Sequence, residues 1–227
     1  MPAVEAGPGG EDARLTERAR LIERARLLDV SLSETAAERL LQLLDELERW
    51  NKAYNLTAIR DRAEMLTHHL LDSLGTHPYL EGGRIADVGS GAGFPGLPLA
   101  VANPRREFTL IDSSGKKTRF LAHVVRTLGL ENVTAAHVRV EALAPAQPFD
   151  TVVARAFAAL PELLEKVRSL TAAGTRVLAM KGRYPAAEIA AVRAPWRLVS
   201  ARRLEIPGLG EERHLVTLEL ANVHLPK

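Results

Sequence analysis

The sequence contains no cysteine among its 227 residues. Disulfide bonds, thiolate metal sites and catalysis by a cysteine nucleophile are therefore excluded. Enzymes that methylate C5 of pyrimidines are excluded with them, because that chemistry normally begins with the addition of a cysteine to C6 of the base.

Long hydrophobic runs are missing too. No apolar stretch approaches the ~20 residues of a membrane-spanning helix, and the start of the chain lacks the basic residues and apolar core of a secretory signal peptide. We therefore expect a soluble, cytoplasmic protein with no membrane partner. The composition, 46% apolar and 26% charged, is ordinary for a globular protein with one sizeable core.

A large net charge of either sign is also lacking, since the formal value is +2. The charge is unevenly distributed, however. Residues 1–50 hold 7 basic and 11 acidic residues, whereas the rest of the chain holds 23 basic and 17 acidic residues. The basic excess therefore lies in the later part of the chain, as an anionic partner would require.

The first third of the sequence predicts helices. Residues 1–13 are rich in Gly, Pro, Ala and acidic residues, and we expect a disordered tail there. An N-terminal helical region is predicted over 14–80. Apolar residues recur in it at helical spacing in three stretches, 14–28, 33–50 and 63–74. Ser33 and Asp61 stand as caps before the second and third helices, which a polar break at 51–57 separates.

From residue 84 onward, strand-like and helix-like segments alternate, which predicts a parallel sheet. Strands are expected at 84–88, 107–111, 132–136, 150–154 and 175–180. Helices are expected at 97–103, 116–128, 139–143, 159–169 and 185–193. Two more strands, 197–204 and 213–220, are joined through Pro207–Gly210 as a hairpin-like pair. We expect residues 81–227 to form one α/β domain.

A glycine-rich segment, Asp87–Gly96, follows the first of these strands directly. Gly89, Gly91 and Gly93 let the backbone turn tightly and approach a ligand with no side chain between. The next strand ends in Asp112, about twenty residues after the glycines, as in nucleoside sites of doubly wound sheets. There the loop holds one end of the ligand, and the carboxylate accepts hydrogen bonds from ribose hydroxyls.

Two cofactors compete for this loop. Gly91–Gly96 satisfies the dinucleotide pattern G-x-G-x-x-G, while Asp87–Gly93 satisfies the D-x-G-x-G-x-G pattern of S-adenosylmethionine-dependent methyltransferases. A pyrophosphate needs backbone N–H donors at the helix start, and Pro95 and Pro98 remove two of them. The zwitterionic methionine moiety tolerates that loss, and Asp87 would lie near its ammonium group, so the pattern favours S-adenosylmethionine.

The predicted fold is therefore α/β. It is a class I, Rossmann-like S-adenosylmethionine-dependent methyltransferase with a seven-stranded mixed sheet, an antiparallel last strand and an N-terminal helical segment. Dinucleotide-binding folds more often close with a parallel strand, which also disfavours an NAD-dependent oxidoreductase.

The chain resembles the bacterial 16S rRNA guanine-N7 methyltransferase family RsmG, also called GidB. Six motifs carry the resemblance in the family's order: Trp50–Thr57, His69–Ser73, Phe94–Pro98, Asp112–Ser113, Arg155–Phe157 and Glu212–Leu215. It covers nearly the whole chain from about residue 32 onward, and the charged N-terminal extension is the main departure.

The resemblance implies methyl transfer from S-adenosylmethionine to N7 of a guanosine, position 527 in the usual rRNA numbering, in the 530 loop of 16S rRNA. It places Gly89 and Phe94 in the cofactor loop, Asp112 and Ser113 at the ribose, and Val140 and Glu141 beside the adenine. With the loop residues added, the expected cofactor-binding set is Asp87, Gly89, Gly91, Gly93, Phe94, Asp112, Ser113, Val140, Glu141 and Arg155.

The residues after the fourth strand are consistent with that target. Ala154–Phe157 lacks the Asn/Asp-Pro-Pro-aromatic motif of exocyclic amine methylation, and Lys181 has no evident companions of a ribose 2′-hydroxyl methylation set. The lone pair of guanine N7 is already free at neutral pH, so no general base is expected. Catalysis would rest on holding N7 in line with the methyl group at ~3–3.5 Å.

Arg155 is the expected catalytic residue, in a positioning role. Its guanidinium could hold the methionine carboxylate, pair with RNA phosphate or stack on a base. Alternatively, it is a structural arginine that bridges the sheet edge to Asp72 or another carboxylate. Phe157 could stack on a flipped guanine or belong to the core.

The expected partner is 16S rRNA, in the small ribosomal subunit or an assembly intermediate. Candidate RNA contacts lie near the predicted strand ends: Lys116, Lys117, Arg119, Lys181, Arg183, Arg213 and His214, with Arg202 and Arg203 as further basic positions. Any of these could instead be a solvated surface charge. Asn51 and Asn55 could cap a helix end or contact RNA, and Trp50 is expected in the core.

No metal site is expected. His68 and His69 are adjacent, point to different faces of a helix, and lack a third ligand at suitable spacing. We expect a monomer, because no coiled-coil heptads are present. A methyltransferase for a small molecule or protein, and an RNA-binding module without turnover, remain alternative functions at this stage.

Overall fold

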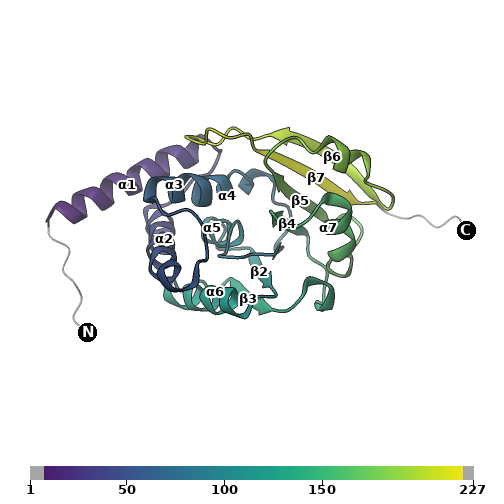
Figure 1. Cartoon of the computed structure of the whole chain (residues 1–227), viewed down its shortest axis with the longest axis horizontal. Coiled ribbons are helices and arrows are strands. Elements are labelled where there is room, and N and C mark those ends of the chain that lie inside the picture. The colour runs from purple at the N-terminus through teal and green to yellow at the C-terminus, as the bar shows by residue number, and fades with distance from the viewer. Residues whose placement is uncertain (1–7, 222–227) are drawn as a thin grey trace, which may run out of the picture.

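A computed structural model of the chain describes residues 8–221, which form one central sheet covered by helices on both faces (Figure 1). The strands are β1 Arg84–Val88, β2 Glu107–Asp112, β3 Val133–His137, β4 Thr151–Arg155, β5 Arg176–Lys181, β6 Trp196–Arg203 and β7 His214–Leu220. Their order across the sheet is β3-β2-β1-β4-β5-β7-β6. β7 pairs antiparallel with both β5 and β6, while the other neighbours are parallel. The predicted seven-stranded mixed sheet is therefore confirmed.

The helices vary more in length than the strands, from 3 residues to 21. The α-helices are α1 Pro8–Arg26, α2 Glu34–Tyr54, α3 Arg62–Met65, α4 Asp72–Leu74, α5 Gly96–Ala102, α6 Gly115–Thr127, α7 Leu160–Lys166 and α8 Ala186–Ala190. A π-helical segment, Leu66–Leu71, joins α3 to α4, and single 3₁₀ turns lie at His77–Tyr79, Val140–Ala142 and Arg168–Leu170. None of the helices within residues 8–221 is long and apolar enough to cross a bilayer.

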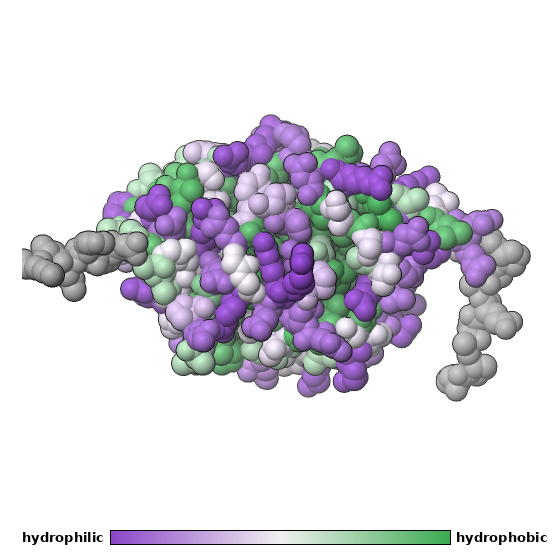
Figure 2. Space-filling model, turned by 180° about the vertical axis from the view of Figure 1, so that it is seen from behind, coloured by the Kyte–Doolittle hydropathy of each residue, from purple (hydrophilic) through white to green (hydrophobic). Residues whose placement is uncertain are grey.

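Two hydrophobic clusters lie on the two faces of the sheet. One contains the inward residues of α1, α2, α5 and α6 together with Phe108 and Leu110 of β2. The other contains Leu160 and Leu164 of α7 with Val152 of β4. Figure 1 shows the same layers, with α7 on the opposite side of the sheet from α2 and α5. Seen from behind, hydrophilic residues cover most of the surface (Figure 2).

The N-terminal segment differs from its prediction. Residues 8–13, expected to be disordered, belong to α1, which begins at Pro8; residues 1–7 lie outside the described part of the chain. Proline suits the first turn of a helix, and Glu11 and Asp12 lie near the positive end of the helix dipole. These local signals outweigh a composition that is otherwise typical of disordered tails.

The second helix is longer than expected. It begins after Ser33, whose side chain accepts a hydrogen bond from the Ala36 N–H as predicted, but it ends at Tyr54 rather than Trp50. Asn55 then adopts the left-handed conformation (φ +48°) that asparagine tolerates at helix ends. Asn51 is buried and binds both backbone groups of Thr57. The capping interpretation is thus confirmed for Asn55, whereas Asn51 lies within the helix and holds the segment that follows it.

The helical region and the sheet share a core. Leu40 and Leu44 of α2 belong to the same buried cluster as Phe108 and Leu110 of β2. The predicted boundary between residues 80 and 81 therefore separates helical elements from α/β elements that pack in the same core. That the two regions are separate domains stays a prediction.

Candidate functional site

The glycine loop lies at the carboxyl end of β1. Its N–H groups at Gly89 and Ser90 donate to the Ile111 carbonyl at 2.8 and 3.1 Å, which ties the loop to β2. Gly89 and Gly91 have φ of +68° and +60°, a backbone region that other residues rarely adopt. A Cβ at Gly89 would lie 2.4 Å from the Phe157 ring, whereas one at Gly91 would meet only the Gly89 carbonyl at 3.8 Å. The backbone at Gly91 is therefore open to close approach by a ligand.

Asp112 ends β2 beside this loop. Its side chain is buried, and it accepts hydrogen bonds from the N–H groups of Gly91 (2.9 Å) and Ser114 (2.8 Å). Each carboxylate oxygen has more than one acceptor direction. Asp112 can therefore hold the loop and still accept hydroxyl groups from a ligand.

The first cavity lies over the ends of β1, β2 and β4 and has a volume of about 320 Å³. Its lining residues are Gly89, Ile111, Asp112, Ser113, Ser114, Lys117, Val138, Arg139, Val140, Glu141, Ala156, Phe157 and Lys166. An acceptor carboxylate at one wall and apolar side chains at Val138 and Val140 suit a ribose and a flat base. The residues therefore fit the nucleoside part of S-adenosylmethionine.

Asp87 lies behind the loop rather than in this cavity. It is fully buried, its Oδ2 accepts the Gly96 N–H at 2.9 Å, and its Oδ1 has no partner among the described residues. Burial raises the pKa of Asp87 to about 7, against the opposing hydrogen bond from Gly96. An unpartnered buried acceptor behind the glycine loop fits the expectation of a positive group near Asp87.

Phe94 is also buried, and its ring stacks on His69, with ring centres 4.6 Å apart and an angle of 17° between the planes. The Arg155 guanidinium carbon lies 5.6 Å from the centre of the same ring. His69 Nε2 lies 3.0 Å from Thr57 Oγ1. Burial, assisted by the charge of Arg155, lowers the pKa of His69 to about 4, so its imidazole is neutral at pH 7.

A second cavity of about 420 Å³ lies over the ends of β4 and β5. Its lining residues are Ile59, His68, His69, Asp72, Arg155, Ala156, Met180, Lys181, Gly182 and Arg213. Arg155 and Arg213 both pair with the buried Asp72, at 3.3 and 2.7 Å. The bridge from the sheet edge to Asp72, weighed as the structural alternative for Arg155, is therefore present, and the same side chain lines the cavity.

Ala156 joins the two cavities, because it lines both of them. Its φ of +51° is a left-handed conformation, which costs a non-glycine residue roughly 1–2 kcal/mol. Of its neighbours, Arg155 lines only the second cavity and Phe157 only the first. Strained backbone of this kind concentrates at functional sites.

The structure brings together only part of the expected cofactor-binding set. The residues that line the first cavity are Gly89, Asp112, Ser113, Val140 and Glu141. Asp87, Gly91, Gly93 and Phe94 do not line it, and Arg155 belongs to the second cavity. Gly93 lies against α5, where a Cβ would be 2.2 Å from the Leu97 side chain. That Asp87, Gly91, Gly93, Phe94 and Arg155 contact the cofactor stays a prediction.

The expected RNA contacts are also divided. Lys117 lines the first cavity, and Lys181 and Arg213 line the second. Lys116 donates to the Tyr54 carbonyl at 3.0 Å, and Lys181 is paired with Glu188 at 2.8 Å. Two positions have contrasting surroundings: Arg119 is exposed, whereas His214 is buried and donates from Nδ1 to the Gly182 carbonyl at 2.8 Å. A structural role is thus the simpler account of His214.

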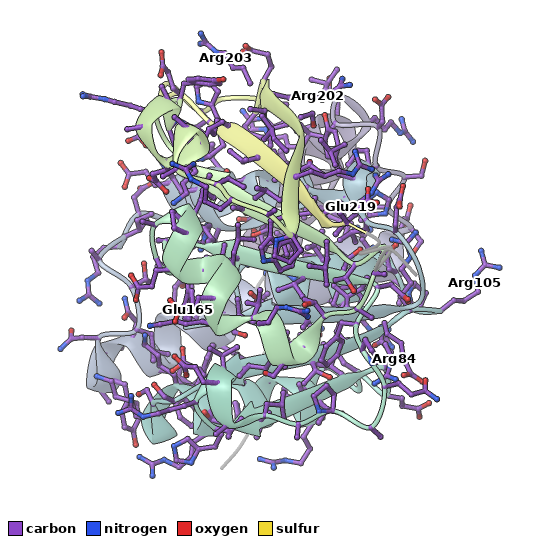
Figure 3. All side chains as sticks on the ribbon, turned by 90° about the vertical axis from the view of Figure 1, so that its right-hand side faces the viewer. Arg84, Arg105, Glu165, Arg202, Arg203 and Glu219 are labelled. Atoms are coloured by element: carbon purple, nitrogen blue, oxygen red, sulfur yellow. The ribbon has the colours of Figure 1, made fainter. Side chains whose placement is uncertain are left out.

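Three further arginines lie near the carboxyl end of the outer strands. Arg183 borders a hollow together with Arg213. The register pairs Lys181 with His214 and His214 with Arg203, so the end of β6 is level with the end of β5. Figure 3 shows Arg202 and Arg203 at the top of the view and Arg84, at the start of β1, at the lower right.

Sequence reasoning missed several residues of the two cavities. Lys166 on α7 and Arg139 before the 3₁₀ turn line the first, and Ile59 and His68 line the second. His68 belongs to a pair that the sequence singled out only as an unsuitable metal site. For Ile59 and Lys166 the sequence carries no signal, because their roles arise from packing between distant segments. Trp50, expected in the core, is partly buried and packs against that core, with its ring 5.5 Å from that of Phe120.

A solved S-adenosylmethionine-dependent methyltransferase from Aquifex aeolicus has a similar fold. Its TM-score is 0.55 at 18% sequence identity, and the match covers 74% of this chain and 97% of that protein. This similarity confirms the Rossmann-like methyltransferase fold predicted from the sequence.

The GidB family profile, described as rRNA small subunit methyltransferase G, matches residues 36–216. A protein named ribosomal RNA small subunit methyltransferase G from Alkalilimnicola ehrlichii is 53% identical over 190 residues, 84% of this chain and 86% of that protein. One of the same name from Marinobacter nauticus is 46% identical over 197 residues, 87% and 92% of the two chains. The prediction of S-adenosylmethionine as the cofactor is confirmed with the family and the fold. On these matches, the chain belongs to the GidB family of rRNA small subunit methyltransferases G.

Proposed function

We propose that this protein methylates N7 of a guanosine in the 530 loop of 16S rRNA, the reaction implied by its family resemblance. The observation that carries the proposal is the pair of adjoining cavities, which meet at Ala156. One is suited to a nucleoside cofactor, and the other is lined by arginines. The relatives' names add small-subunit rRNA as the substrate class. Such a substrate would place the protein in the cytoplasm, where we expect it to act as a monomer.

In this proposal the first cavity holds the cofactor, with Asp112 at the ribose and Val140 and Phe157 beside the base. When bound, S-adenosylmethionine supplies a methyl group on a positively charged sulfur. The second cavity receives the target guanosine, with Met180 and Ile59 as apolar walls and guanidinium groups at its edge. The contribution of the chain is then mainly positioning, which brings N7 and the methyl group into line.

The transfer assay tests the substrate class. Purified protein is incubated with radiolabelled S-adenosylmethionine and small subunits, naked 16S rRNA or naked 23S rRNA from cells that lack the endogenous activity. We expect label in 16S rRNA only, and the comparison of naked RNA with subunits shows which form is the substrate. Binding of the cofactor without label in any rRNA would contradict the proposal. It would favour a small-molecule or protein substrate, or a binding-only role.

His68 provides a separate test of the atom that is methylated. Its half-buried imidazole lines the second cavity, where it could act as a general base. Two other residues of this cavity are less suited to act as a base, because His69 has a pKa of about 4 and Asp72 is held between two arginines. Methylation of N7 needs no proton abstraction before transfer, whereas an amine or hydroxyl target uses a base that contributes typically 10²–10⁴-fold.

For His68→Gln we therefore expect a single-turnover methylation rate within about threefold of the wild-type rate, since no base contribution would be lost. A fall of 100-fold or more, with unchanged affinity for cofactor and RNA, would move the target away from N7. His77→Gln serves as a matched control, because His77 is a partly buried histidine outside both cavities.

A further inference from the structure

Asp72 is a buried carboxylate that gathers two arginines from distant parts of the chain. Its side chain is 2% exposed at the start of α4. Arg155 Nη1, at the end of β4, lies 3.3 Å from Oδ2, and Arg213 Nε, just before β7, lies 2.7 Å from Oδ1. The three residues connect the helical region, the parallel part of the sheet and its antiparallel edge at one point.

Both guanidinium groups keep donors beyond those that Asp72 accepts. Within residues 8–221, Arg155 uses Nη1 for Asp72 and for the His68 carbonyl at 2.9 Å, and no other hydrogen bond is formed by its Nε or Nη2. Arg213 uses Nε for Asp72 and donates weakly from Nη1 to the Glu212 carbonyl at 3.5 Å, and its Nη2 lies 3.8 Å from Glu211. The two side chains are 23% and 16% exposed and line the second cavity.

The charges at this cavity do not cancel. Among the residues that line the cavity, the Asp72 carboxylate faces two guanidinium groups, which leaves an excess of one positive charge there. Glu211 lies 3.8 Å from Arg213, but it is 68% exposed and does not line the cavity. Lys181 adds none, because Glu188 neutralises it at 2.8 Å. The remaining donors and the positive excess suit a phosphate group, which a guanidinium binds through two parallel hydrogen bonds.

We propose that Asp72 is a positioning residue, which fixes Arg155 and Arg213 as a paired phosphate site for the target nucleotide in the second cavity. This inference rests on the proposed function. In this proposal Asp72 does not contact the RNA, but it orients the guanidinium groups of Arg155 and Arg213. The phosphate so held fixes where the base enters the cavity.

The test separates positioning from attraction. Asp72→Asn removes a negative charge, so the pocket attracts RNA at least as strongly as before while the arginines lose their common anchor. We expect RNA affinity equal to or greater than that of the wild type, cofactor affinity within twofold, and a single-turnover methylation rate at least tenfold lower. All three are measured at a temperature where circular dichroism shows each variant to be folded.

The matched control is Glu46→Gln. Glu46 is another buried carboxylate with two partners, His123 at 2.7 Å and Arg49 at 3.0 Å, and it lies on α2 outside both cavities. Its methylation rate should equal that of the wild type. Should Asp72→Asn fail to fold, Arg213→Lys is the replacement test. It keeps the positive charge beside Asp72 but lacks the guanidinium group that can form two parallel hydrogen bonds. It should retain RNA affinity within threefold and lose at least tenfold in rate.

Two results would overturn the inference. One is a wild-type rate in Asp72→Asn or, if that variant does not fold, in Arg213→Lys. The other is a loss of rate that only follows the folded fraction and RNA affinity, as in a merely structural role. If the wild-type protein transfers no methyl group to any rRNA, the proposed function fails and the inference fails with it. If the wild type is active, these variants decide the inference alone.

Discussion

The side chains of the site are largely fixed by other parts of the protein. Asp112 is held by two backbone N–H groups, Asp72 by two arginines and Lys181 by Glu188. Such groups lose little conformational freedom when a ligand binds, which is the general advantage of preorganised sites. The chemistry at this scale is therefore best tested by substitutions that disturb one contact at a time.

Gly91 offers such a substitution. A Cβ there meets nothing of the protein nearer than 3.8 Å, so Gly91→Ala adds strain from φ +60° and a methyl group in open space. Gly129→Ala is the matched control, since it has the same φ of +60° and no neighbouring atom within 4 Å. We expect both variants to lose roughly 1–2 kcal/mol of stability.

Only Gly91→Ala should weaken cofactor binding, by about tenfold or more, because the added methyl group would meet the cofactor, a cost of roughly 1.4 kcal/mol. Isothermal titration with S-adenosylmethionine measures the difference. Equal affinities in the two variants would show that the cofactor does not approach the backbone at Gly91.

The buried Asp87 predicts a dependence of stability on pH. Its pKa is about 7 in the folded protein, raised by burial from 3.8. Between these values the unfolded chain has lost the proton that the folded chain keeps, so stability falls as pH rises towards 7. The full difference corresponds to roughly 4 kcal/mol. His69 acts in the opposite direction, because its folded pKa of about 4 lies below 6.5, and stability is lost as pH falls through that interval.

Asp87→Asn isolates the first effect, since His69 contributes equally to both proteins. The stability of the variant relative to the wild type should increase from pH 5 to pH 8, by roughly 1–4 kcal/mol. Urea unfolding at each pH measures it. A difference that stays constant with pH would mean that Asp87 does not titrate in this range.

At the scale of elements, α1 is attached to the rest of the helical region by ion pairs. Arg62 in α3 lies 2.8 Å from Glu17 of α1, 2.8 Å from Asp45 and 3.1 Å from Glu48 of α2. Arg14 in α1 pairs with Glu38 of α2 at 2.8 Å. The pKa of Arg62 is raised despite burial, because these carboxylates favour its charged form. A network of partly buried charges contributes more than separate surface pairs.

Arg62→Met should therefore destabilise the protein by about 1–3 kcal/mol, since it removes the counter-charge that three carboxylates share. Arg14 then remains 3.0 Å from Asp45 and 3.9 Å from Glu17. Added salt should recover part of the loss by screening the repulsion between the carboxylates. Arg18→Met is the control: its carboxylate partners lie at 3.5 and 3.9 Å, and its removal should cost less than about 1 kcal/mol. Urea unfolding at low and high salt tests both, and equal losses would contradict a special role for Arg62.

The elements of the sheet were predictable from the sequence because each strand is short, apolar and bounded by turn residues. The observed strands differ from the expected ranges by at most one residue at either end. The end of α2 was not predicted, since it depends on the left-handed Asn55 and on the contact of Asn51 with Thr57 beyond the helix. The start of α1 was missed because the composition of residues 1–13 is typical of disordered tails, although proline and acidic residues favour a helix start there. The first cavity was also predictable, because the glycine spacing and Asp112 at the end of β2 are features of one short stretch of sequence.

At the scale of the whole molecule, the second cavity could not be predicted in the same way. Its central group joins Asp72 to Arg155 and Arg213, which are 83 and 141 positions away along the chain. No local pattern encodes such distances. The sequence marked all three residues and offered a bridge from Arg155 to Asp72 as one alternative, but it did not connect Arg213 to them. The pairing emerges only when α4, β4 and β7 meet around the sheet.

In the proposed reaction, the methyl group passes from the first cavity to the second. In that reaction the cofactor binds in the cavity over β1 and β2 and the acceptor binds in the cavity over β4 and β5, with Ala156 between them. Methylation of N7 leaves a purine whose glycosidic bond is labile, so the modified nucleotide can be located chemically. That property allows the proposed reaction to be examined at a single atom of the RNA.

The most direct measurement is therefore to map the methylated base. Small subunits from cells that lack the activity are labelled by the purified protein, and the 16S rRNA is treated with borohydride and aniline. We predict one cleavage, in the 530 loop, that appears only after incubation with both protein and S-adenosylmethionine. Label incorporated without cleavage, or cleavage elsewhere in the rRNA, would contradict the account.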